Sequence, residues 1–586
     1  MRRRWPDKRF PDSLISGAPR RDVMRTVALL ATLGLLLSGC FDGGSEPATG
    51  APRDPSPQMP PDAQLAEAGR WLAPFDGEVP AVNMVLLHTG EVLYWSGVEE
   101  NGDDPTDVPF LVTPTKPGET RVLVFEDSAP TILMPGLPDG GAADLFCSGQ
   151  TILPDGRVLT GGGSEFHGGP NPDTPYILDG SHDARIFDPL TRNWTVVSDM
   201  LLGRWYPSLF TDADGNGVAA SGIASLTDPT EHWPQWEQYD AADDSWSGVD
   251  GTDQLLPLYP RVFTVPGGPY KGQVFYNTVG TLWGPFGEHP LEATWNFQYV
   301  YDPVADAWTQ LGLSTYGVRQ HGASVMLQLD PSDGYAPELV TFGGSLWRSF
   351  VATAATERND LSTSPPTNTM AAPMNQARWH LNGVLLPDGD VLAVGGGLYD
   401  NVYTIGTENP PVMTAESFDP QTGAWTELAA MSVPRMYHST ALLLPDGRVL
   451  AGGHVPLPQE PTNPAQEQIH ETRLEIFEPP YLFRGERPSI LSAPEEITYG
   501  EAFDMDVALN GTLDSVVLVH PGATTHAFDS NQRSVRLKVT AQEDGHLRVV
   551  APPDGHVVPP GHYMVFVNRQ HPDGAVPSVA AWVHLD

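Results

Sequence analysis

Strand-like runs that end in glycine recur along most of the 586-residue chain, and this repetition constrains the fold more than any other feature. Seven such runs end at Gly97, Gly163, Gly222, Gly280, Gly344, Gly397 and Gly453. The six intervals from Gly97 to Gly453 average about 59 residues, a period typical of repeat architectures with inserted loops. We therefore expect one repeat unit for each run.

Two further signatures predict hairpins inside these units. Leu-Pro-Asp-Gly turns begin at Leu153, Leu386 and Leu444, and Asp-Gly supplies the positive φ of a tight turn. A Phe-Asp or Tyr-Asp pair is followed by a Trp that can pack between sheets in four units, at 187–194, 239–246, 301–308 and 418–425. Seven four-stranded units arranged radially form a seven-bladed, kelch-type β-propeller, which we predict for residues 71–486.

Composition and the C-terminal pattern complete the expected all-β fold. The chain has 59 Gly, 59 Pro and only 18% charged residues, which is typical of turn-rich globular proteins. Beyond Glu486 the repeat stops and short alternating segments continue, with turns at Asn510-Gly511 and Asp554-Gly555. This spacing predicts an immunoglobulin-like β-sandwich over residues 487–586. The formal net charge of −41 argues against nucleic acid and anionic lipid surfaces as partners.

The N-terminal segment MRTVALLATLGLLLSGC, residues 24–40, predicts export. Its apolar stretch, 27–37, is shorter than the roughly 20 residues that span a bilayer. Residues 37–40 resemble the lipobox of bacterial lipoproteins, in which Cys40 becomes the first mature residue and carries lipid. We expect a leader over 1–40, a flexible linker over 41–70, and a cell-envelope lipoprotein or extracellular protein attached to membrane only through lipid.

Cys147 is the one cysteine that remains after lipidation of Cys40, so an internal disulfide is excluded. An isolated cysteine is most often a buried apolar thiol. However, Cys147, Tyr206 and Tyr437 each lie 16 residues before the last glycine of their unit. Equivalent positions in a radial repeat converge, so we expect these three side chains at one end of the central channel.

Two histidine positions near this register are weighed differently. His438 directly follows Tyr437, and adjacent residues can serve one site only in an irregular loop, because neighbours on a strand point to opposite faces. Trp379 and His380 fall near the same register without a tyrosine. A single axial histidine of this kind is more often a satisfied core residue than a ligand.

Several segments resemble the copper radical oxidases, the family of galactose oxidase and glyoxal oxidase. These are FCSGQTILPDGRVLTGGG, GRWYPS, RMYHSTALLLPDGRVLAGG, GATTHAFDSNQR and PPGHYMVFV. The similarity runs from about Trp71 to Asp586 and is closer to glyoxal oxidases. It implies a mononuclear copper site with a thioether that joins Cys147 to Tyr206. It also implies equatorial ligands Tyr206, His438 and His526, and Tyr437 as the axial ligand.

The same resemblance implies an oxidase that converts small aldehydes or primary alcohols, including carbohydrates, with O2 to give H2O2. Tyr437 would take the substrate proton and the Tyr206 radical would abstract hydrogen. Trp283 is a candidate to shield that radical. His526 is preferred over His520 because its Gly-, Thr- and Asn-rich surroundings indicate a loop, whereas His520 ends an apolar strand. His520 and His167 remain candidates for contacts around the site.

Two other function classes stay open from the sequence. A propeller with a sandwich can be a noncatalytic carbohydrate-binding or adhesive surface protein, which would need neither Cys147 nor the Tyr437-His438 pair. A metal-binding scaffold without redox activity is the second, and a peroxide assay on copper-loaded protein separates it from an oxidase. We expect a monomer in each case.

Replacing Cys40 by Ser should abolish lipid attachment, because the thiol is the acylated group of a lipobox. Mass spectrometry of the membrane fraction checks this, with acyl mass expected on the N-terminal peptide of the parent only. Recovery of the parent in detergent-free soluble fractions without any acyl mass would show that the lipobox prediction is wrong.

Overall fold

The computed structural model describes residues 61–96, 120–126, 130–135, 145–167, 177–225, 231–281, 292–346, 349–399, 409–455 and 471–586. The predicted leader and most of the linker lie outside these ranges. Within them the α-helical content is α1 (Pro61–Ala68), and strands dominate the rest. No helix in these ranges is long and apolar enough to cross a membrane. The all-β class predicted from the repeats is confirmed.

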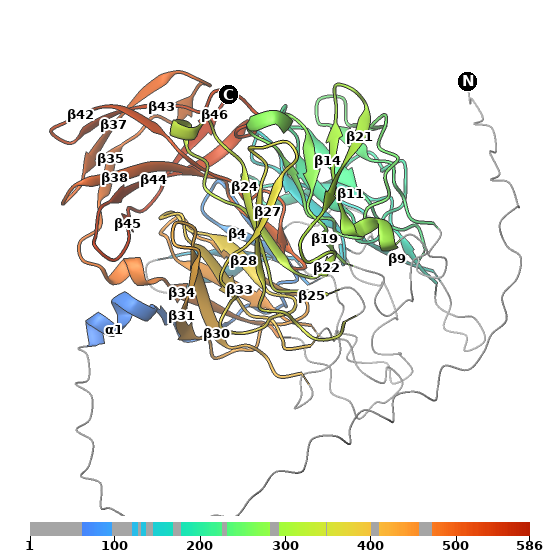
Figure 1. The fold of residues 1–586 in the computed structure, drawn as a ribbon, viewed down its shortest axis with the longest axis horizontal. Coiled ribbons are helices and arrows are strands. Elements are labelled where there is room, and N and C mark those ends of the chain that lie inside the picture. Colours follow the sequence, from blue (N-terminus) through green and yellow to red (C-terminus); the bar gives the residue numbers. More distant parts are fainter. Residues whose placement is uncertain are drawn as a thin grey trace, which may run out of the picture. The chain divides into compact units, whose positions relative to one another are not determined.

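Antiparallel four-stranded sheets follow one another along the chain, each built from strands in sequence order (Figure 1). Their strands are β7 (Gly149–Ile152), β8 (Val158–Gly161), β11 (Ala184–Asp188) and β12 (Asn193–Val196); β13 (Ser208–Thr211), β14 (Gly217–Ala220), β15 (Glu237–Asp240) and β16 (Ser245–Gly248); β17 (Val262–Thr264), β18 (Val274–Tyr276), β20 (Phe297–Asp302) and β21 (Ala307–Leu313); β23 (Ala323–Met326), β24 (Glu338–Phe342), β26 (Thr356–Asp360) and β27 (Thr367–Met370); and β28 (Asn382–Leu385), β29 (Val391–Val394), β30 (Thr414–Asp419) and β31 (Ala424–Ala430). Each of these five sheets contains one of the glycine-ended runs of the sequence.

Two further sheets join segments that are far apart in the sequence. The first contains β32 (Ser439–Leu443), β33 (Val449–Gly453) and β34 (Arg473–Glu478), and it is completed by β1 (Arg70–Trp71) and β2 (Phe75–Asp76). The second contains β3 (Asn83–Leu86), β4 (Val92–Trp95), β5 (Thr120–Val124) and β6 (Thr131–Leu133), and it is extended by β39 (Ala523–Thr525) and β40 (Phe528–Asp529). The C-terminal segment therefore contributes strands to a sheet of the repeat region.

Residues after Ser489 form two more sheets that share one core. One contains β35 (Ser489–Ser492), β37 (Ala502–Ala508), β43 (His546–Val550) and β42 (Lys538–Glu543); the other contains β36 (Glu496–Ile497), β46 (Ala581–Leu585), β44 (Gly561–Arg569), β38 (Leu513–Val519), β41 (Ser534–Arg536) and β45 (Val576–Pro577). Met505 and Leu547 of the first sheet belong to the same buried cluster as Leu518 and Val565 of the second. Short strands elsewhere are β9 (Ser164–His167), β10 (Ile177–Gly180), β19 (Val279–Gly280), β22 (Arg319–Gln320) and β25 (Ser345–Leu346).

The hairpins predicted from both sequence signatures are present. In each Leu-Pro-Asp-Gly turn the leucine N–H donates to the carbonyl oxygen four residues later over 2.8 Å, and the turn glycine has a positive φ. In each aromatic-Asp…Trp hairpin the two aromatic residues are directly paired across the strands. The pairs are Phe187 with Trp194, Tyr239 with Trp246, Tyr301 with Trp308, and Phe418 with Trp425.

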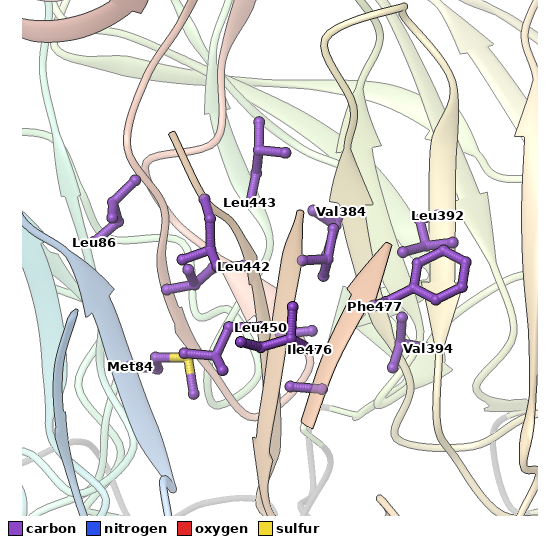
Figure 2. Close-up of a cluster of buried hydrophobic side chains, with 14 of the residues drawn as sticks. Met84, Leu86, Val384, Leu392, Val394, Leu442, Leu443, Leu450, Ile476 and Phe477 are labelled. Atoms are coloured by element: carbon purple, nitrogen blue, oxygen red, sulfur yellow. The ribbon is translucent and has the colours of Figure 1, made fainter. Parts of the chain in front are cut away.

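Neighbouring sheets pack face to face through aliphatic side chains. Figure 2 shows Leu442, Leu450 and Ile476 of one sheet between Met84 of a second and Val384 of a third, all in one buried cluster. All five side chains are at most 5% exposed. At about 1.5–3 kcal/mol for each fully buried aliphatic side chain, this packing is a main contribution to holding the sheets together.

Four sheets also contain a buried Arg–Glu pair that the sequence analysis did not identify. The arginine precedes the first strand and the glutamate lies on the third: Arg204 with Glu237, Arg319 with Glu357, Arg378 with Glu416, and Arg435 with Glu475. Every one of these side chains is at most 2% exposed. Glu416 also accepts hydrogen bonds from the backbone N–H groups of Asn375 (2.6 Å) and Gln376 (3.3 Å). Each carboxylate therefore fixes the connection that leads to the first strand.

Replacing Glu416 by Ala should lower the free energy of unfolding by about 3–5 kcal/mol, because Arg378 would remain buried without its counter-ion. Urea unfolding monitored by tryptophan fluorescence measures this. Glu543→Ala is the control: it removes an exposed glutamate from strand β42, in a different sheet from the pair, and should change the free energy of unfolding by at most about 0.5 kcal/mol. Equal effects for the two variants would contradict a structural role for the pair.

Candidate metal centre

A set of residues with left-handed backbone conformation marks the same point in six successive sheets. Cys147, Tyr206, Tyr259, His321, His380 and His438 all precede the first strand of their sheet and have φ between 42° and 65°. Non-glycine residues rarely adopt this conformation, so its regular recurrence is a property of the repeat. Backbone hydrogen bonds link the turns: Tyr206 N–H donates to Cys147 O (3.2 Å), and Tyr259 N–H donates to Tyr206 O (3.0 Å).

The left-handed turns show that Tyr437 does not occupy the position predicted for it in the repeat. The structural equivalent of Cys147 and Tyr206 is His438, not Tyr437. Tyr437 is instead equivalent to Phe146 and Trp205, because all three pair with the residues that follow the glycine-ended strand. The sequence count was one position off because Gly453 corresponds to Gly162, not to Gly163, and His454 takes the place of the last glycine: φ is 72° and 114° at Gly453 and His454, against 72° and 117° at Gly162 and Gly163. Both Tyr437 and His438 lie in this turn, outside any strand, as predicted.

His526 enters the same region from the C-terminal part of the chain. It lies in the turn between β39 and β40, and β39 pairs with β3 so that Thr525 is opposite Asn83. The buried Arg261 guanidinium donates to the His526 carbonyl oxygen over 2.6 Å. The loop predicted for His526 is confirmed, and β39 supplies the extra strand that carries it inward.

The predicted ligands converge in one buried cluster. The hydroxyl oxygens of Tyr206 and Tyr437 are 2.7 Å apart. The His438 and His526 rings meet edge to face with centroids 4.7 Å apart, and the Tyr206 ring is also 4.7 Å from His526. Cys147 is fully buried and belongs to the same apolar cluster as Tyr206. All five site residues predicted from the sequence therefore lie together.

Hydrogen bonds fix which nitrogen of each imidazole carries a proton. His438 Nδ1–H donates to the Val455 carbonyl (2.8 Å). Thr525 Oγ1 donates to the Val82 carbonyl (3.0 Å), so it accepts from His526 Nδ1–H (2.7 Å). Neither Nε2 has a hydrogen-bond partner within the described part of the chain, and both atoms are buried. Two lone pairs are thus presented to the cluster, which is the usual orientation of metal-binding histidines.

Burial sets the protonation of the donors. It lowers the pKa of His438 to about 3 and, with neighbouring imidazoles, that of His526 well below the ordinary histidine value. Burial, then the Cys147 thiol and the Tyr437 phenol, hold the pKa of Tyr206 well above the ordinary tyrosine value. The histidines are therefore neutral and able to bind a cation at neutral pH. The Tyr206 phenol therefore ionises only when a cation compensates its charge.

The aromatic residue that covers Tyr206 was not found from the sequence. Trp205 lies parallel to the Tyr206 ring, with centroids 3.6 Å apart and planes at 9°. The residue expected in this role, Trp283, lies outside the described residues. Adjacent side chains can stack in this way because Tyr206 has a φ of 60°, so the two rings do not diverge as they would on a strand. The sequence did not indicate Trp205 because it does not show the positive φ of Tyr206.

The other histidines considered fall into two groups. His380 was expected to be a satisfied core residue, yet both of its ring nitrogens are buried without a hydrogen-bond partner in the described ranges. Its ring is 5.1 Å from Tyr437 and 4.8 Å from His321, so these two imidazoles border the cluster. His520 instead packs on Tyr563 and contacts no site ring in the described structure. The side chain of His167 lies outside the described residues.

Comparisons with known proteins agree with this cluster. Residues 294–481 match the family described as "Glyoxal oxidase N-terminus", and residues 487–585 match "Galactose oxidase-like, Early set domain". Aldehyde oxidase GLOX of Vitis pseudoreticulata is 30% identical over 475 residues, which cover 75% of this chain and 82% of that protein. The chain belongs to the copper radical oxidase family. It is therefore a copper-dependent oxidase, and the noncatalytic alternative is set aside.

More distant relatives share the fold of this oxidase. Galactose oxidase of Gibberella zeae is 24% identical over 531 residues, which cover 88% of this chain and 70% of that protein. A solved fungal alcohol oxidase of the AA5 family, in complex with copper, superposes with a TM-score of 0.68 at 23% identity. The match covers 89% of this chain and all of that structure.

Replacing His526 by Ala in the oxidase should reduce copper affinity by at least about 100-fold, because one of two neutral imidazole donors is lost. Metal analysis after dialysis against a chelator should give one copper per parent chain and little in the variant. His520→Gln is the control, since this buried histidine lies outside the cluster, and it should retain copper. Equal copper retention by His526→Ala and the parent would contradict the ligand assignment.

Proposed function

We propose that this oxidase holds one copper ion between Tyr206, Tyr437, His438 and His526, and oxidises small aldehydes, as their hydrates, or primary alcohols. The single observation that carries the proposal is the meeting of two phenol oxygens, 2.7 Å apart, with two imidazoles whose Nε2 atoms are buried and unpartnered in the described structure. The aldehyde oxidase named above supports the substrate class. The reaction consumes O2 and gives H2O2.

The donor set fits copper. Neutral imidazole nitrogens suit Cu(II), and two phenol oxygens complete four donors of the kind found in tetragonal sites. Calcium and magnesium prefer sets built from carboxylate and carbonyl oxygens, which these side chains do not offer. When bound, copper supplies a one-electron acceptor next to the Tyr206 ring.

The protein's own residues divide the remaining work. Tyr437 is 7% exposed, more than His438 or His526, and its hydroxyl oxygen can take the proton of a substrate hydroxyl. A thioether from Cys147 to the Tyr206 ring makes that ring easier to oxidise, and the oxidised Tyr206 removes a hydrogen atom from the substrate carbon. Trp205 covers the ring and excludes water from it. Two electrons and two protons leave the substrate and appear in H2O2.

The finer architecture and location belong to the same proposal. The succession of sheets supports a seven-bladed propeller over residues 71–486, and the shared core of the last two sheets supports an immunoglobulin-like sandwich over 487–586. The leader and linker, residues 1–70, support export, with attachment to the membrane through lipid on Cys40. The enzyme acts as a monomer.

Cys147→Ala should retain copper and oxidise glyoxal or methylglyoxal far more slowly than the parent. The ligand atoms remain, but the ring that supplies the second oxidising equivalent is no longer modified. Peroxide release measures the activity. Peptide mapping of the aerobically copper-loaded parent should give one branched peptide that joins the segments around Cys147 and Tyr206, lighter by two hydrogen atoms. Fully active parent with an alkylatable Cys147 would contradict the mechanism.

A further inference from the structure

A row of polar side chains crosses strands β44, β46 and β36 of the C-terminal region and shares no residue with the proposed copper ligands. His562 on β44 is paired with His584 on β46, and His584 is paired with Glu496 on β36. Paired residues on neighbouring strands project from the same face, and Asp586 shares that face because it lies two positions after His584. Four residues from three parts of the sequence are thus brought side by side.

The donor atoms of three of these residues lie close enough to share one ion. His584 Nδ1 is 2.9 Å from Glu496 Oε2 and 3.3 Å from Asp586 Oδ1. One donor atom from each residue lies within 4.8 Å of the other two. An ion bound at about 2.0–2.2 Å from imidazole nitrogen and carboxylate oxygen requires donor separations below about 4.4 Å, which small rotations of these side chains supply.

The tautomer of His584 is the observation that indicates a cation. Its Nε2 lies 3.1 Å from the carbonyl oxygen of Pro154, which can only accept, so Nε2 carries the proton. The Nδ1 atom of His584 then faces one oxygen atom from each of two carboxylates, so three possible ligand atoms converge on one point. A cation at this point can be bound by all three. A histidine that donates its distant N–H to a backbone carbonyl while its near nitrogen faces other ligands is typical of metal sites.

The surroundings hold this arrangement in place. Asp586 is fixed at both backbone groups: its N–H donates to Ile497 O (3.1 Å), and its carbonyl accepts from Tyr499 N–H (3.2 Å). His562 packs beside His584 with ring centroids 4.6 Å apart, and His88 stacks on His562 at 4.2 Å.

We infer that His584, Glu496 and Asp586 form a second metal site, which takes a divalent transition-metal ion of the Zn²⁺ class. One imidazole and two carboxylates match the ligands of Zn²⁺ better than those of Ca²⁺ or Mg²⁺, which seldom accept imidazole. The carboxylates are 70% and 71% exposed, so the ion exchanges with solvent and the site is open to further ligands. Because Pro154 belongs to a repeat turn, the ion also braces the contact between that turn and β46.

The site is tested with copper-loaded protein, so that the copper centre is filled, by titration with Zn²⁺ in a calorimeter. The parent should bind one further Zn²⁺, and Glu496→Gln should weaken this binding by about 100-fold while it keeps its copper. Glu495→Gln is the matched control, because Glu495 is exposed and its side chain projects from the opposite face. This variant should bind Zn²⁺ as the parent does. This comparison separates the site from general attraction to an acidic surface.

A second measurement does not depend on the calorimeter. Zn²⁺ that binds only the folded protein should raise the thermal midpoint of the parent and of Glu495→Gln, but not that of Glu496→Gln. No extra Zn²⁺ equivalent in the parent, or equal binding by Glu496→Gln, would overturn the proposal. Both outcomes leave the copper assignment unaffected, because the two sites share no residue.

Discussion

The pairing of β39 with β3 is the interaction on which the copper centre depends. It places a C-terminal hairpin against β3, the first strand of a repeat sheet, and this brings His526 to Tyr206, Tyr437 and His438. Thr525, the last residue of β39, both donates to the Val82 carbonyl and accepts from His526, so one hydroxyl fixes the hairpin and the tautomer. Without this pairing the repeat region would keep only three of the four donors that we propose for copper.

Left-handed backbone turns are the second requirement, because they direct one residue of each sheet toward the others. Such conformations cost roughly 1–3 kcal/mol for each non-glycine residue, and six sheets have one. The buried Arg–Glu pairs offset part of this cost, since the glutamate also holds the connection that enters the turn. The same geometry allows Trp205 to stack on its neighbour Tyr206. The left-handed turns and the buried Arg–Glu pairs therefore belong to one repeated structure. The stacking of Trp205 on Tyr206 depends on one of these turns.

The copper centre and the proposed zinc site follow the same rule in different surroundings. In both, a backbone carbonyl or a hydroxyl oxygen accepts a hydrogen bond from one ring nitrogen, and the other nitrogen faces the proposed metal position. The copper donors are buried and lack carboxylates, which suits a redox metal screened from water. The row at His584 has exposed carboxylates, which suits an exchangeable ion without redox chemistry.

The sequence by itself determined the all-β class and the hairpins, because these depend on turn chemistry and local periodicity, and its multi-residue motifs pointed to the five residues that we propose for the site. Local spacing could not fix Tyr437 to within one position, since it does not show that His454 takes the place of the last glycine in that unit. It also could not show that Trp205 covers Tyr206, that His380 borders the site, or that Glu496 meets His584. Those contacts depend on backbone dihedral angles and on strand pairing between distant segments, which only the tertiary structure decides.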